Sequence, residues 1–154
     1  MALNSAGITA AIAALSITGV TVKDVDAIPE SVLPRDCPIL FPQPGNWLGG
    51  TQIISDAEGR TTFGAAGARF WVAERTFNYV FLSAGLGTGR GNRDLYSAAT
   101  TETELILTAI TAIDVNGVDL KDASHEPIGV GKDAAGKNFV GCLFHFTFRE
   151  RINA

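Results

Sequence analysis

The spacing of apolar residues changes along the chain, and each change predicts a different element. Near the N-terminus, Ile8, Ile12 and Leu15 lie at helical spacing, and Gly19 marks the end of this segment. Residues 20–25 then alternate between apolar and polar types, as in a strand. The chain is therefore expected to begin with a short helix followed by a strand.

Residues 26–46 have a different pattern, with prolines at positions 29, 34, 38, 42 and 44. A regular helix is excluded here, because each proline lacks an amide donor and fixes its own φ. The apolar residues between the prolines still need cover, so we expect an extended strap across the domain rather than a free linker. Residues 39–41 within it are expected to form a short edge strand.

From residue 51 the pattern is typical of strands. Segments 51–55 and 60–64 flank the turn sequence DAEG and predict a hairpin. Residues 68–84 form the longest strand-like run. Its apolar residues change parity near Glu74–Thr76, which predicts a bulge or bend because the side-chain period of an unbroken strand is two.

The second half of the chain contains the main helix and a long closing strand. Residues 93–113 repeat apolar positions every three or four residues, interrupted by Glu102, and predict a helix with a kink or second start at Thr100–Thr101. A turn or short strand is expected at 115–122. The turn sequence DAAGKN follows, and a final strand is expected at 139–152, with one face formed by Val140, Cys142, Phe144, Phe146 and Phe148.

This order of elements predicts a single α+β domain over residues 1–154. Its sheet is expected to be mostly antiparallel, with a short N-terminal helix and one long helix packed on it.

Composition narrows the class of protein. Charged residues make up only 18% of the 154 residues, against about 25% in an average soluble domain. Mean hydropathy is +0.19, and high hydropathy with little charge excludes intrinsic disorder. The net charge of −4 argues against a protein that grips nucleic acid through a basic surface. The low charge itself calls for an explanation.

Residues 6–22 resemble a signal peptide or membrane span, but neither interpretation fits. The first basic residue is Lys23, so a positive segment does not precede the run. The run also contains four Ser or Thr and two Gly residues. We expect a soluble protein made in the cytosol. Cys37 and Cys142 lie outside any metal-binding motif and are expected as buried thiols, although their spacing leaves a disulfide open.

The sequence offers no convincing catalytic, cofactor-binding or metal-binding set, so an enzyme is not expected. His125 and His145, the two histidines, lie on separate segments and lack metal-ligand spacing. The acidic pairs Asp24/Asp26, Glu102/Glu104 and Asp119/Asp122 are interpreted as solvated faces and turns, because they do not have the spacing of a calcium loop.

The glycine-rich segment 85–93 follows a predicted strand and precedes a helix, where phosphate-binding loops occur. Its spacing differs from a dinucleotide fingerprint, which after Gly85 and Gly87 needs glycine where Arg90 stands. A P-loop signature is also missing. A mobile glycine loop carrying Arg90 and Arg93 is the simpler interpretation, and such a loop could still contact a phosphate backbone or a partner protein.

The segment PGNWLGG at 44–50 contains Trp47 and Leu48, a pair poorly suited to a core. A tryptophan at an interface supplies a large contact area at little cost in entropy, so Trp47 is a candidate anchor for a partner. Packing of Trp47 onto the strap is an equally good interpretation.

The order of elements, the apolar ILFPQPG within the strap and the closing FxGxxFxFxxRE from Phe139 to Glu150 resemble a known group. The chain is similar to the small neck and tail-end proteins of long-tailed bacteriophages, most nearly the tail terminators. The resemblance is one of architecture over most of the chain, and no shared motif assigns roles to individual residues.

The resemblance implies a virion protein, made in the host cytoplasm, that forms a ring of identical copies, typically a hexamer. Such a ring ends the tail tube, contacts the tube protein and the head-side connector, and lets DNA pass through its lumen. Trp47, Leu48, Arg90 and Arg93 are then candidate contacts between subunits. A head-closure, tail-tube or adaptor protein remains an alternative, as does a small nucleotide-binding domain using the 85–93 loop.

Overall fold

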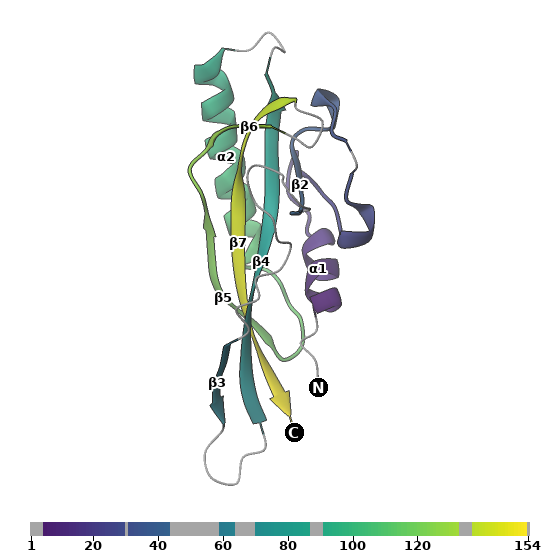
Figure 1. Cartoon of the computed structure of the whole chain (residues 1–154), viewed down its shortest axis with the longest axis vertical. Helices are drawn as coiled ribbons and strands as arrows, with labels where there is room; N and C mark the ends of the chain where they lie inside the picture. The colour runs from purple at the N-terminus through teal and green to yellow at the C-terminus, as the bar shows by residue number, and fades with distance from the viewer. Residues whose placement is uncertain are drawn as a thin grey trace.

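The computed structural model describes residues 5–29, 31–43, 59–63, 70–86, 91–132 and 137–153. Within these residues the protein is an α+β domain, as the sequence predicts, with helices α1 (Ser5–Ala13) and α2 (Asn92–Ile110) on a seven-stranded, mostly antiparallel sheet (Figure 1). The strands are β1 (Thr21–Val22), β2 (Ile39–Pro42), β3 (Gly59–Phe63), β4 (Phe70–Gly85), β5 (Val118–His125), β6 (Gly129–Lys132) and β7 (Asn138–Asn153).

Two long central strands organise the sheet. Its order is β1-β2-β4-β7-β5, with β3 added beside β4 and β6 beside β7. β4 and β7 pair antiparallel over almost their full lengths, from Phe70 opposite Asn153 to Gly85 opposite Phe139. β1 and β2 are parallel, and the remaining pairs are antiparallel. Because β4 and β7 are each 16 residues long, they extend beyond the helices at one end (Figure 1).

One face of the sheet carries both helices and most of the aromatic core. Ile8 and Ile12 of α1 and Ile106 and Ile110 of α2 are buried against it. Rings from β4 and β7 contact one another along diagonals, where neighbouring strands bring long side chains within reach. The ring centres lie 5.7 Å apart in Phe77–Phe148, 5.4 Å in Tyr79–Phe146 and 6.0 Å in Phe81–Phe144.

The opposite face is apolar at the end where β2 lies. There, the predicted strap lies over the sheet; it contains two 3-10 turns, η1 (Val25–Ala27) and η2 (Pro34–Asp36), and then joins the sheet as β2. Val32 is fully buried in this second cluster, and Ile28 and Cys37 pack against it. Residues 44–46 of the predicted strap lie outside the described residues.

Several predicted elements need correction. The strand expected at 20–25 is only Thr21–Val22, because Asp24 caps a 3-10 turn through a bond from the Val25 amide at 2.6 Å. The strand at 39–41 extends to Pro42 and is not an edge, since β1 pairs with its outer side. The predicted strand 60–64 corresponds to β3, which pairs with β4. Its expected partner, 51–55, lies outside the described residues.

The predicted bulge at Glu74–Thr76 is wrong, because β4 keeps continuous register with β7 from Phe70 to Leu82. The apolar residues of β4 change from even to odd positions near Glu74 because the two faces of the strand are apolar along different parts of its length. The irregularity lies instead between Leu82 and Ala84, where Ser83 has no partner in the register. Beside it, a Cβ at position 141 would overlap the Phe81 carbonyl oxygen, so the two backbones approach closely at Gly141.

The two long elements of the second half agree best with prediction. α2 is one continuous helix through Thr100 and Thr101, so the expected second start is absent. The predicted closing strand is β7, and its even-numbered residues from 142 to 148 face the helices. The element expected as a turn or short strand at 115–122 is an eight-residue strand, β5.

Candidate functional site

The face opposite the helices changes from apolar to polar along the sheet. Beyond the strap it displays cross-strand pairs of polar side chains, which we call the polar face: Glu74, Thr76 and Asn78 of β4 with His145, Thr147 and Arg149 of β7. These residues alternate with the core aromatics, because successive side chains in a strand point to opposite faces. The closing strand therefore supplies both the aromatic core and the polar face.

An ion cluster lies at one end of the polar face. Glu74 accepts hydrogen bonds from Lys121 Nζ at 2.7 Å and from Arg149 Nη2 at 2.9 Å and Nε at 3.2 Å. The hydrogen bond from Lys121 and then those from Arg149 hold the pKa of Glu74 below its ordinary value of 4.5. The cluster links three neighbouring strands, β4, β5 and β7, and keeps Glu74 ionised at neutral pH.

The middle of the polar face contains a row of hydrogen-bonding side chains. The Thr76 and Thr147 hydroxyls lie 2.9 Å apart. His145 Nδ1 lies 2.7 Å from Asn78 Oδ1, and its Nε2 lies 3.8 Å from a carboxylate oxygen of Glu126. Ser124 is opposite His145 in the register, but no hydrogen bond joins them. The row orients an imidazole without presenting an activated nucleophile to it.

The two histidines are not brought together. His125 follows on β5 and packs its ring against Phe144 at 5.5 Å, so it lies with the core on the helix side, whereas His145 is on the polar face. Among the described residues, no group of three or more His, Cys, Asp or Glu side chains is arranged to hold a metal ion.

Both cysteines are free thiols on opposite sides of the sheet. Cys142 belongs to the core under the helices, and Cys37 packs in the cluster under the strap. Burial raises the pKa of each to about 12, with Asp36 adding to the effect at Cys37 and Glu126 at Cys142. A thiol with so high a pKa is protonated at neutral pH and is a poor nucleophile.

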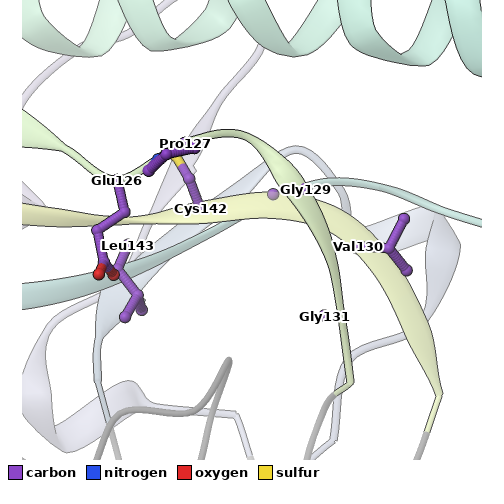
Figure 2. Close-up of a pocket in the computed structure, with 8 residues that line it drawn as sticks. Glu126, Pro127, Gly129, Val130, Gly131, Cys142 and Leu143 are labelled. Atoms are coloured by element: carbon purple, nitrogen blue, oxygen red, sulfur yellow. The ribbon is translucent and has the colours of Figure 1, made fainter.

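A small hollow lies beside the pairing of β6 with β7. Figure 2 shows Pro127 beside the Cys142 sulfur, the Glu126 carboxylate near Leu143, and Val130 on the far side of the β6 arch. Glycines at 129, 131 and 141 leave the space, which measures about 120 Å³. This is well below the roughly 300 Å³ at which small-molecule sites begin, so the hollow is a consequence of close strand packing.

Two larger hollows are lined by described residues. One, of about 330 Å³, is apolar and lies between β6 and the start of α2, where Tyr96 and Val130 are 60% and 62% exposed. The other, of about 420 Å³, lies between β1, the two 3-10 turns and β2. Its polar lining residues are Thr21, Lys23, Arg35 and Asp36.

Of the predicted contact residues, the structure places only Arg93, which is exposed in the first turn of α2. Trp47, Leu48 and Arg90 lie outside the described residues. The strand before the glycine loop, β4, is antiparallel to both β2 and β7, so it is not part of a parallel βαβ unit.

Sequence reasoning missed the polar face and the hollow with Lys23 and Arg35. The polar face had a usable signal, since the alternation of Leu143, His145 and Thr147 with the aromatics was visible. No sequence signal indicated that Lys23 and Arg35 line the same hollow. Their proximity depends on the parallel pairing of β1 with β2 across a stretch of irregular chain.

In the part of the chain that the structure describes, no helix is long and apolar enough to cross a membrane. No protein-family model matches the sequence, and a search of curated proteins finds no significant match.

Proposed function

We propose that the protein is a non-enzymatic virion subunit of a long-tailed bacteriophage. Copies of it form a ring at the tail end that terminates the tail tube and joins it to the head connector. The observation that carries this proposal is a strand arm formed by β3 with the outer ends of β4 and β7, residues 59–63, 70–73 and 150–153, which extends beyond α1 and α2 (Figure 1).

The arm is a feature that a neighbouring copy would explain. Its β4 segment reads FWVA from Phe70 to Ala73, four apolar residues in succession. Continuous apolar runs are typical of strands buried on both faces. Among the described residues no helix lies over this segment. In a ring each subunit presents one surface to the copy before it and another to the copy after it, so a neighbouring copy can lie against this arm.

The composition supports the same proposal. With only 18% charged residues, the surface is sparsely charged for a monomer. The net charge of −4 suits a lumen through which DNA passes, since an acidic wall does not hold the phosphate backbone.

The direct test is the size and shape of the purified protein. Light scattering coupled to size-exclusion chromatography, followed by negative-stain imaging, should find discrete rings. A monomer at every concentration tested would overturn the proposal. Long tubes would overturn the terminator assignment and indicate a tube subunit instead.

Two further variants test the contact role of residues 44–50 and the nucleotide-binding alternative. If residues 44–50 contact a neighbouring copy, Trp47→Ala with Leu48→Ser should weaken the ring, whereas unchanged size and assembly would contradict that role. If the 85–93 loop binds nucleotides, a nucleotide should raise the melting temperature and Arg90→Ala should abolish the rise. The ring proposal expects no such stabilisation.

A further inference from the structure

The sheet has two chemically different edges. At the β1 edge, Lys23 and Arg35 line the hollow of about 420 Å³ together with Thr21 and Asp36. Neither Lys23 nor Arg35 has a side-chain hydrogen bond or ion pair with another described residue. Asp36 is already engaged, since one of its oxygens accepts a bond from the Leu33 amide at 2.9 Å. Two cations are therefore available at this edge to bind an anionic group.

The opposite edge of the sheet is acidic. Asp119 and Asp122 are exposed on β5, opposite Arg149 and Thr147 of β7, and so lie on the polar face. Neither carboxylate has a partner among the described residues. The nearby cations Lys121 and Arg149 are both bound to Glu74, at 2.7 Å and 2.9 Å. The β5 edge therefore presents two carboxylates whose charge the protomer itself does not neutralise.

We propose that Lys23 and Arg35 of one copy bind Asp119 and Asp122 on β5 of the next copy. This inference rests on the ring proposed above and specifies the contact that closes it. Because the two charged sites are at opposite ends of one sheet, their pairing joins copies head to tail, which is the kind of interface a ring requires. Arginine favours the contact, since its planar fork can bind a carboxylate through two parallel hydrogen bonds.

The two sites are staggered along the strands. Lys23 follows Val22, which is level with Phe81 of β4 through Leu40, whereas Asp122 is level with Thr76 through Thr147. Since β1 is parallel to β2 and β2 is antiparallel to β4, Lys23 itself is level with Val80, four residues from Thr76, and the offset is about 13 Å at the usual rise of a strand. Adjacent copies then meet with their strands inclined to the ring axis, in the way that stagger and tilt are linked in closed barrels.

Charge reversal provides a sharp test. K23E/R35E makes both edges acidic, and D119K/D122K makes both basic, so each variant alone should associate at least about tenfold more weakly than the wild type. When the two variants are mixed, every contact again joins opposite charges, and alternating rings should reappear. K132E/K137E, which changes the net charge by the same amount elsewhere, should leave assembly unchanged. Sedimentation velocity measures the wild type, the two variants, their mixture and the control.

The outcomes distinguish this inference from the proposed function. A wild-type monomer would overturn both. Wild-type rings that persist in K23E/R35E, or variants that fail to reassemble when mixed although circular dichroism shows them folded, would overturn the edge pairing alone. Stabilisation of the wild type by inorganic phosphate or citrate, lost in K23E/R35E without any change in assembly, would assign the hollow to a small anion instead and would also overturn it.

Discussion

At the scale of single residues, Gly141 shows how closely the central strands approach. A Cβ there would overlap the backbone of Phe81 on β4, and neither strand can move without breaking the ladder around it. Steric overlap, rather than backbone conformation, restricts position 141 to glycine. Among the described glycines, positive φ occurs at Gly19 and Gly117 and not at Gly141. This close approach accompanies the irregularity at Ser83 and fixes the register of the two long strands.

We predict that Gly141→Ala destabilises the fold by about 1–3 kcal/mol, the usual range for forcing an extra group into a packed site. Gly129 provides a matched control, since it is the register partner of Gly141 on β6 and a Cβ there meets nothing within 4 Å. Gly129→Ala should change stability by no more than about 0.5 kcal/mol. Urea unfolding measures both, and equal effects would contradict the role given to the Phe81 backbone.

Glu74 leads to a prediction about pH. Its pKa is lowered in the folded state, chiefly by the hydrogen bond from Lys121 and then by those from Arg149, so the unfolded chain takes up this proton first on acidification. The stabilisation is therefore complete above the ordinary pKa of 4.5 and is lost as the pH falls through the folded-state value.

Glu74→Gln should accordingly cost up to about 1 kcal/mol at pH 7, as expected for an ion pair near the surface. The difference from wild type should shrink towards zero between pH 5 and pH 2, when urea unfolding is followed across that range. Glu104→Gln, at an exposed position on α2, is the control and should show no comparable loss at pH 7. A Glu74→Gln deficit that stays constant into acid would contradict the ion-cluster explanation.

At the scale of elements, α2 is attached to the sheet through both apolar packing and a polar contact. Ser83 donates a hydrogen bond to a carboxylate oxygen of Glu102 at 2.9 Å, and Ser83 is 4% exposed. Glu102 is the residue that interrupts the apolar stripe of the helix. Its place in that stripe is explained by the serine that the β4 irregularity leaves beneath it.

Ser83→Ala should destabilise the protein by about 1 kcal/mol, because the Glu102 carboxylate loses a buried donor. Ser97→Ala, at an exposed position on α2, should be neutral or slightly stabilising through helix propensity. Combining Ser83→Ala with Glu102→Gln in a double-mutant cycle isolates the pair, and a coupling of about 0.5 kcal/mol or more is expected. Thermal and urea unfolding of the wild type, the two single variants and the double variant measures the cycle. Additive changes in the free energy of unfolding would contradict a contribution from the contact.

The elements that could be predicted are those whose period is sustained. α2 and β7 have long apolar repeats, so their type and inward faces follow from the sequence, although α2 ends at Ile110 rather than at 113. The strand expected at 20–25 exists as β1, but its two-residue length and its partner could not be predicted, because both depend on pairing with Ile39 and Leu40 far along the strap. The bulge was misplaced because β4 is apolar on both faces along different parts of its length.

At the scale of the whole molecule, the low charge and the distribution of the charges that remain are related. α1 and α2 bury the helix face and the strap covers part of the other face, while two groups of charged side chains without partners among the described residues, Lys23 with Arg35 and Asp119 with Asp122, lie at the two sheet edges. The low charge of the sequence supports the proposal that some surface is reserved for other subunits. It could not locate that surface, because the edges are defined by pairings between distant segments.

The forces that hold copies together can be distinguished by salt. If the β1 and β5 edges form the contact, association should weaken between 50 mM and 1 M NaCl, since the Debye length falls from more than about 10 Å to about 3 Å. If the apolar hollow beside Tyr96 and Val130 forms it instead, sulfate should strengthen association, and Val130→Ser should weaken it. Sedimentation velocity in both salts measures which of the two contacts holds the copies together.

We expect the ring to dissociate in NaCl. The mixture of K23E/R35E with D119K/D122K should show the same salt dependence, because the mixture restores opposite charges at every contact. Rings that persist at 1 M NaCl would contradict an interface held by these four side chains.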